Sequence, residues 1–208
     1  RRNRRLPKCG RDLSNFPMAI INGEEFPAIA GNNITSLNRY SGKVLWNSGT
    51  PPLSLVDQAI TSAKESFCGW ASTTLEERID VLNRFTKIVE EKRLFLVNLV
   101  AEEASKPIWE ANIEVTGLIT KLTASIEAYT SRNKETSREI KGLLSRTRYK
   151  PHGVICVLGP YNFPLTMANS HIMPSLLAGN TVIFKPSELT PLSGIAVSRI
   201  WQEAGLPK

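Results

Sequence analysis

An α/β fold built on a parallel sheet is the class that this sequence of 208 residues predicts. Two apolar runs, residues 153–158 and 181–184, are each followed by a segment with helical spacing, residues 165–177 and 191–204. A continuous apolar run is typical of a strand covered on both faces, and the order strand, helix, strand, helix favours parallel pairing. The residues before this unit are expected to form a largely helical lead-in.

The lead-in begins with β structure. A short apolar run at residues 18–21 precedes Asn22-Gly23, the dipeptide most typical of a tight hairpin, and the return strand is expected from Glu24. A second turn at Ser41-Gly42 precedes a strand at residues 43–46. Residues 18–47 are therefore expected to form a small β-rich segment.

Helices are expected to follow. Ser54 with Asp57, and Thr74 with Glu77, have the spacing of capping boxes ahead of two helices. A third helix is expected over about residues 91–104. A fourth begins at Pro107, a residue suited to the first turn, and its apolar side chains recur every three or four residues. Residues 18–129 are thus predicted to be the β/helical part that precedes the sheet.

Composition and charge narrow the class of protein. The apolar content of 41% and charged content of 22% are ordinary for a soluble globular chain, and no apolar run approaches the roughly 18 residues that cross a bilayer. The three cysteines are widely spaced and odd in number, which argues against a disulfide framework, so a cytoplasmic location is expected. Two histidines without clustered cysteines or carboxylates predict no metal site.

The net charge of +7 is concentrated at one end. Residues 1–17 hold six basic side chains against one aspartate, so they carry +5 and leave +2 on the other 191 residues. This extension could be a phosphate-binding arm, or a segment that is non-native or disordered. Because no aromatic residues are interleaved with the arginines, we favour the second interpretation and expect no nucleic-acid partner.

Residues 130–150 are polar and basic around Gly142, which predicts an exposed hairpin of two strands. The parallel-sheet unit, residues 151–208, follows. Within it, Cys156 and His152 are separated by roughly 13 Å along a strand, too far for a thiol–imidazole dyad. Cys156 is therefore interpreted as a small buried apolar residue, and His171 as a packing or capping residue.

Two turns follow the predicted strands, at the edge where ligands bind in open α/β sheets. The first, Gly159–Pro164, carries Asn162, whose amide has two donors that could stabilise an oxyanion; an asparagine that bonds its own turn fits the spacing better. The second carries Lys185 and Glu188, which could hold a ribose or form a surface pair, with Ser187 as a helix cap. The Gly-x-Gly-x-x-Gly of an ordinary dinucleotide fold is absent.

Taken together, residues 151–164, 176–181 and 184–191 resemble the aldehyde dehydrogenase superfamily, because several of its motifs recur in order at the right separations. The resemblance covers residues 18–208. Within the superfamily, the sequence resembles the branch that acts on N-succinylglutamate semialdehyde. The features that carry this resemblance are Tyr161, residues 169–172 and the run Lys106–Ala111. The implied fold is α/β and aldehyde dehydrogenase-like, with a helical lead-in, a β-hairpin arm and the first part of a dinucleotide-binding domain.

The resemblance also implies roles for single residues. Asn162 matches the oxyanion-hole amide, Lys185 and Glu188 match residues that bind the adenine ribose, and Pro160 and Tyr161 match contacts that line the cofactor site. Glu188 would repel a 2′-phosphate, so NAD is the expected cofactor. The hairpin at residues 130–150 is similar to the family's oligomerisation arm and implies a homodimer of the full-length enzyme, with a small-molecule aldehyde as substrate.

One departure from the family concerns the chemistry. The family's nucleophilic cysteine and general-base glutamate lie after the position that matches Lys208, and none of Cys9, Cys68 or Cys156 matches the nucleophile. We therefore expect the amino-terminal part of such an enzyme, with a truncated cofactor unit and no activity of its own. The alternatives are a non-catalytic remnant that binds nucleotide or associates with a full-length partner, or another semialdehyde dehydrogenase.

Overall fold

The computed structural model describes residues 13–207, so most of the expected extension at residues 1–17 lies outside the described residues. Its described end packs on the body of the protein. Leu13–Asn15 forms a single 3₁₀ turn, and Phe16 after it is buried. The indole nitrogen of Trp46 donates a hydrogen bond to the carbonyl oxygen of Phe16 at 2.9 Å. The first described residues, which belong to the segment 1–17 expected to be a non-native or disordered extension, therefore contact the core.

Two small antiparallel hairpins come first, in the segment predicted to be β-rich; the first of them was predicted as a hairpin. β1 (Ala19–Ile21) pairs with β2 (Glu24–Phe26), and β3 (Ile34–Leu37) pairs with β4 (Val44–Ser48). Between β1 and β2, Asn22 and Gly23 have φ angles of 51° and 75°. This is the left-handed backbone that a two-residue hairpin turn requires, and it explains why Asn-Gly occupies the turn.

Four helices complete the lead-in: α1 (Leu53–Ala71), α2 (Leu75–Glu91), α3 (Arg93–Glu103) and α4 (Ile108–Arg132). The capping box of Thr74 and Glu77 is confirmed, since each side chain bonds the other residue's backbone amide. The predicted cap at Ser54 is wrong: α1 begins at Leu53, after Pro52, and no side chain caps it. With Pro52 as the N-cap, the helix begins two residues earlier than a Ser54 cap would allow, and the fixed φ of proline suits this position.

The parallel unit matches the prediction in order and direction. It consists of β7 (Val154–Leu158), α5 (Thr166–Leu177), β8 (Thr181–Lys185) and α6 (Pro191–Glu203). β7 and β8 pair in parallel, with Val154 opposite Thr181 and Leu158 opposite Lys185. α5 and α6 are followed by Gly179 and Gly205, whose positive φ angles of 82° and 85° end each helix.

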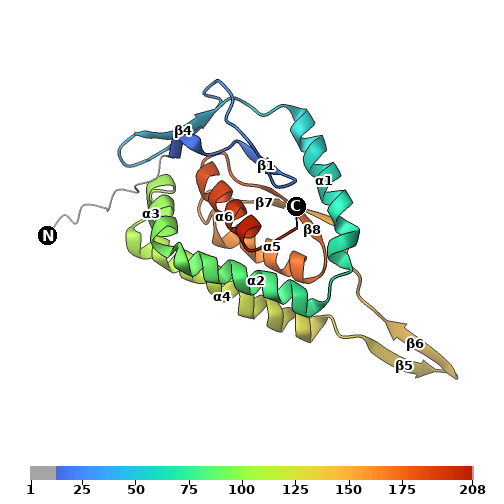
Figure 1. Cartoon of the computed structure of the whole chain (residues 1–208). Helices are drawn as coiled ribbons and strands as arrows, with labels where there is room; N and C mark the ends of the chain where they lie inside the picture. Colours follow the sequence, from blue (N-terminus) through green and yellow to red (C-terminus); the bar gives the residue numbers. More distant parts are fainter. Residues whose placement is uncertain (1–12, 208) are drawn as a thin grey trace.

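The core lies where the lead-in helices meet this unit (Figure 1). Phe85 of α2 stacks on Trp201 of α6 with ring centroids 3.7 Å apart, and Leu118 of α4 and Met173 of α5 are fully buried. The helices of the lead-in thus form one hydrophobic core with α5 and α6.

One expectation about the sheet is wrong. β7 is not covered on both faces, because Val157 is buried whereas Cys156 and Leu158 are exposed. The sheet that contains β7 has two strands in the described part of the chain, and β7 has no neighbour on its outer edge. The apolar composition of residues 153–158 therefore does not mean that both faces of β7 are covered in the part of the chain that the structure describes.

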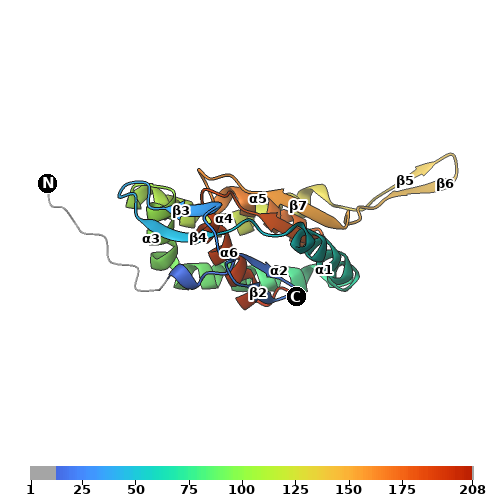
Figure 2. The same ribbon diagram turned by 90° about the horizontal axis from the view of Figure 1, so that it is seen from above.

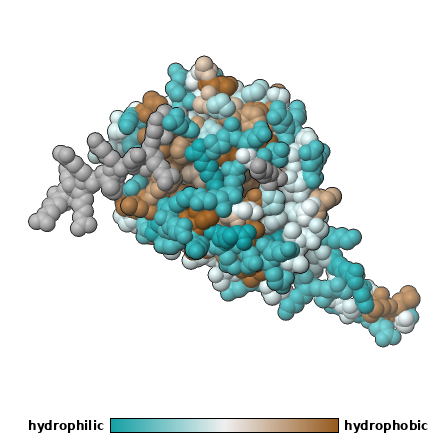
Figure 3. Space-filling model, viewed as in Figure 1, coloured by the Kyte–Doolittle hydropathy of each residue, from teal (hydrophilic) through white to brown (hydrophobic). Residues whose placement is uncertain are grey.

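The hairpin of β5 (Thr136–Ile140) and β6 (Leu143–Thr147) projects from the body, as both ribbon views show (Figures 1 and 2). Every side chain on its two strands is exposed. Its tip nevertheless carries Ile140, Leu143 and Leu144, which appear as the hydrophobic end of the arm in Figure 3. Within residues 13–207, none of the helices is both long and apolar enough to cross a membrane.

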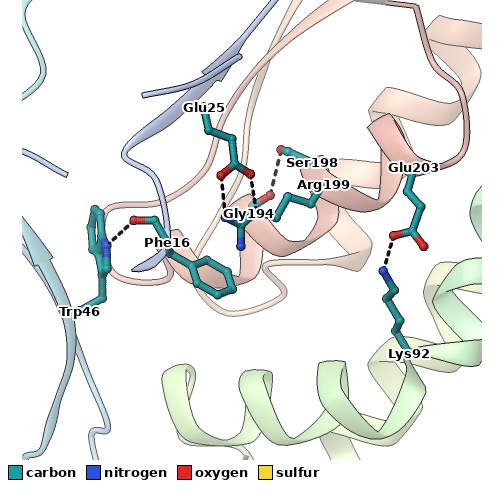
Figure 4. Close-up of polar contacts among 8 residues, drawn as sticks. All are labelled: Phe16, Glu25, Trp46, Lys92, Gly194, Ser198, Arg199 and Glu203. Atoms are coloured by element: carbon teal, nitrogen blue, oxygen red, sulfur yellow. Dashed lines mark hydrogen bonds and ion pairs between the residues drawn. The ribbon is translucent and has the colours of Figure 1, made fainter. Parts of the chain in front are cut away.

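Polar contacts tie the outer side of α6 to the lead-in (Figure 4). Arg199 donates two hydrogen bonds to the carboxylate of Glu25 at 2.6 and 2.8 Å, and its guanidinium lies 4.6 Å from the ring centroid of Phe16. At the end of the same helix, Glu203 forms an ion pair with Lys92. These contacts hold α6, which follows the second turn of the candidate site.

Candidate functional site

The two turns singled out in the sequence meet at one edge of the sheet. Leu158, the last residue of β7, lies opposite Lys185, the last residue of β8. The backbone amide of Gly159 donates to the carbonyl oxygen of Lys185 at 3.0 Å, so the turns start side by side. This is the carboxyl edge of a parallel sheet, where open α/β folds bind their ligands.

Asn162 lies exposed on the first of these turns, between the half-buried Pro160 and the buried Pro164. Within residues 13–207, no group forms a hydrogen bond with its side-chain amide. The interpretation that Asn162 bonds its own turn is therefore wrong. Both amide hydrogens are available to an external acceptor, as an oxyanion donor requires. Tyr161, 58% exposed, lies beside it.

Lys185 and Glu188 lie on the second turn and form an ion pair at 3.2 Å. Their side chains are 61% and 63% exposed, so both can reach a ligand. The backbone amide of Glu188 and the ammonium of Lys185 hold the pKa of the Glu188 carboxyl below its usual value. Glu188 is consequently ionised at neutral pH and can accept hydrogen bonds from hydroxyl groups.

The two glycines that border these turns allow close packing. An alanine Cβ at Gly159 would lie 2.8 Å from the Phe184 ring. At Gly194, near the start of α6, it would lie 2.4 Å from the Cβ of Pro186, which belongs to the second turn. Such distances are shorter than carbon atoms tolerate, so the absence of a side chain lets α6 lie directly against the turn.

A buried carboxylate that the sequence analysis did not single out caps α6. Glu103, at the end of α3, is 1% exposed and accepts hydrogen bonds from the backbone amides of Leu192 and Ser193 at 2.9 and 2.8 Å. It also accepts from the hydroxyls of Ser193 and Ser36. Burial raises the pKa of Glu103, and these hydrogen bonds oppose that rise. Ser187, the expected cap, instead accepts from the amide of Leu189.

Glu114 plays the same part at the start of α5. Its carboxylate is fully buried and accepts from the amide of Leu165 at 2.9 Å, while its other oxygen accepts from Lys106 at 2.7 Å. One signal in the sequence could have revealed it: Glu114 lies on the apolar stripe of its helix, between Ala111 and Leu118, where a charge needs a partner. The partner itself could not have been identified.

Two other residues with reactive side chains lie away from the turns. Cys156 and His171 are both exposed, so the interpretations of a buried cysteine and a packing histidine are wrong. Both line a shallow cavity of about 450 Å³ between β7 and α5. In the part of the chain that the structure describes, no three side chains of the metal-ligating types cluster.

The sequence is similar to known proteins over most of its length. Over 187 residues, 90% of the chain, the sequence is 46% identical to the N-succinylglutamate 5-semialdehyde dehydrogenase of Shigella boydii. It is 45% identical to the protein of the same name from Escherichia coli K12 over the same share. The chain spans 38% of the length of these relatives.

Solved structures show the same fold. An aldehyde dehydrogenase from Brucella melitensis aligns with a TM-score of 0.85 at 26% identity, covering 93% of this chain and 40% of that one. A NAD-dependent benzaldehyde dehydrogenase from Corynebacterium glutamicum aligns with 0.81 at 28% identity, covering 95% and 43%. Residues 28–208 also match the sequence profile of the aldehyde dehydrogenase family. This chain therefore belongs to the aldehyde dehydrogenase family.

Proposed function

We propose that this chain forms part of a cytoplasmic, NAD-dependent aldehyde dehydrogenase that oxidises N-succinylglutamate semialdehyde to N-succinylglutamate in arginine catabolism. The observation that carries the proposal is the meeting of the Asn162 turn with the Lys185–Glu188 turn at one sheet edge. Relatives named N-succinylglutamate 5-semialdehyde dehydrogenase, 46% identical to the chain, support the substrate.

The proposed roles follow from the available groups. The side-chain amide of Asn162 donates to the aldehyde oxygen as negative charge develops on it, because no other group occupies its hydrogens. Bound NAD supplies a hydride acceptor. Lys185 and Glu188 are exposed and hold opposite charges 3.2 Å apart, which suits the two hydroxyls of a ribose. Pro160 and Tyr161 line the same edge.

NAD is preferred over NADP in this proposal because Glu188 is ionised. In the proposed ribose site, the ionised carboxylate of Glu188, whose pKa is lowered, would repel a 2′-phosphate. Family members use both cofactors: a glyceraldehyde-3-phosphate dehydrogenase from Bacillus halodurans, 27% identical with a TM-score of 0.84, is described as complexed with NADP. The charge at Glu188 is therefore the property to test.

The 208-residue chain is expected to bind NAD more tightly than NADP, and Glu188→Gln should reduce that preference roughly tenfold by removing like-charge repulsion. Isothermal titration of both cofactors measures it. Glu24→Gln, the same change at an exposed carboxylate of the lead-in, serves as the control. If the parent chain binds neither cofactor, the cofactor role is refuted. If Glu188→Gln leaves the ratio of affinities unchanged, Glu188 does not set it.

Oxidation of the semialdehyde by these 208 residues alone is not expected. The candidate edge holds an oxyanion donor, but neither described cysteine belongs to either turn. A spectrophotometric assay of NADH formation with the semialdehyde should stay at background. Turnover that Asn162→Ala abolishes would overturn this expectation and place a nucleophile within the chain. A chain that binds NAD without turnover remains compatible with a non-catalytic, nucleotide-binding role.

We also propose that the β5–β6 hairpin contacts a second copy of the enzyme. Its strands are exposed throughout, yet its tip presents Ile140, Leu143 and Leu144 to solvent. Replacing all three with serine should shift sedimentation towards monomer without lowering the unfolding temperature, because these side chains lie outside the hydrophobic core of residues 13–207. A parent chain that sediments as a monomer at all concentrations would contradict this proposal.

A further inference from the structure

A buried ion pair lies beneath the turn that carries Asn162. Lys106, in the connection between α3 and α4, is 8% exposed, and Glu114 of α4 is 0% exposed. The ammonium of Lys106 lies 2.7 Å from one carboxylate oxygen of Glu114 and 3.5 Å from Glu110. A buried ion pair stabilises a fold only when its charged groups also form further hydrogen bonds. The remaining contacts of Lys106 and Glu114 therefore indicate the role of this pair.

The remaining contacts of Glu114 are with residues at the start of α5, Leu165 and Thr166. Its second carboxylate oxygen accepts from the amide of Leu165 at 2.9 Å and, more weakly, from that of Thr166 at 3.4 Å. The hydroxyl of Thr166 donates to the backbone carbonyl of Glu114 at 2.8 Å. α5 has no side-chain cap of its own, so Glu114 supplies the acceptor that its first turn needs.

The remaining contact of Lys106 is with the turn itself. Its ammonium lies 3.6 Å from the ring centroid of Phe163, which is a cation–π contact. Ser105, just before it, has a φ of 54°, an uncommon left-handed conformation for a residue with a side chain. The backbone between α3 and α4 therefore turns sharply at Ser105, just before Lys106, which contacts the turn that carries Asn162.

Within residues 13–207, the side-chain amide of Asn162 has no hydrogen bond that could set its direction. Phe163 and Leu165 follow Asn162 in the same segment, and each of them contacts one member of the pair. We propose that Lys106 and Glu114 are positioning residues that hold the Asn162 amide in the direction needed at the sheet edge. The proposal rests on the function proposed for Asn162.

The experiment measures the turn directly in the ¹⁵N-labelled 208-residue chain. Asn162→Asp identifies the side-chain amide resonance of Asn162 by its disappearance. Lys106→Met should displace that resonance and speed hydrogen exchange at the Leu165 amide roughly tenfold. Lys106→Arg, which keeps the cation over Phe163 and beside Glu114, should restore both readouts towards those of the parent.

Lys92→Met is the matched control, because Lys92 forms its ion pair with Glu203 of α6 and not with a residue next to the Asn162 turn (Figure 4). It should leave both readouts unchanged. Should Lys106→Met fail to fold, two variants remain: Lys106→Met with Glu114→Gln, which leaves no buried charge unpaired, and Phe163→Leu, which removes only the ring. Each should displace the Asn162 resonance.

The proposal is overturned if these variants leave the Asn162 resonance in place, or if Lys92→Met changes it as much as Lys106→Met does. It is also overturned if Lys106→Arg fails to restore the parent's resonance. A failure of the proposed function is a different result. The parent chain would then not bind NAD, whereas the resonance and exchange readouts, which need no cofactor, would be unaffected.

Discussion

Replacing Gly194 with alanine should lower the free energy of unfolding by about 2 kcal/mol, the usual cost of inserting atoms into a packed interior. The new methyl group would lie 2.4 Å from the Cβ and 2.7 Å from the Cγ of Pro186. A proline ring cannot rotate away, so α6 or the second turn has to move. Urea unfolding of the parent and the variant, followed by tryptophan fluorescence, measures the difference.

Gly69→Ala in α1 is the matched control, because a Cβ there meets nothing within 4 Å. Alanine favours helices over glycine by about 1 kcal/mol, so this variant should be as stable as the parent or more so. The two substitutions are chemically identical and are expected to have opposite effects. Equal stability of Gly194→Ala and the parent would show that α6 does not lie as close to Pro186 as the structure places it.

Gly194→Ala should also weaken cofactor binding if the proposed function is correct. Pro186 lies between Lys185 and Ser187 in the turn that carries Glu188. Displacing it moves both members of the proposed ribose site, whereas Gly69 has no such neighbour. Titration of NAD into the two variants, at a temperature where both are folded, separates this effect from the loss of stability.

Glu103→Gln should destabilise the protein by about 3 kcal/mol, because buried donors lose the charged acceptor that satisfies them. Four donors converge on this carboxylate: the amides of Leu192 and Ser193 and the hydroxyls of Ser193 and Ser36. An amide side chain has one acceptor oxygen and turns its own NH₂ towards some of these donors. The start of α6 then loses its cap, and its link to α3 and β3 weakens.

Glu102→Gln, at the neighbouring position of α3, makes the same change on a partly exposed side chain. It should stay within about 0.5 kcal/mol of the parent, as surface substitutions do. Chemical denaturation of both variants checks the prediction. If Glu103→Gln and Glu102→Gln unfold at the same urea concentration, the carboxylate of Glu103 is not the cap of α6.

Features that depend on nearby residues were predictable. The Asn22-Gly23 turn and the capping box of Thr74 and Glu77 each involve groups within three residues of one another. The glycine that ends α5, Gly179, belongs to the same class, because its left-handed backbone is a local requirement. The predicted helix cap at Ser54 is wrong because α1 begins at Leu53, directly after Pro52, which occupies the cap position.

The candidate site was predictable only in part. The sequence places Asn162 and Glu188 after two strands, and parallel pairing then brings their turns to one edge. It does not show that the Asn162 amide is left without an internal partner, because spacing alone equally fits an asparagine that bonds its own turn. It also does not show that Cys156 is exposed, since exposure depends on what lies beside the strand.

By itself, the sequence determined the types of element, their order, the parallel pairing and the family. The tertiary structure alone decided which carboxylates hold the site together. Leu192 is 89 residues from Glu103, and Leu165 is 51 residues from Glu114. No local pattern records such distant partners. A buried charge is tolerated only where packing brings donors to it, so its role becomes visible only once the helices are in contact.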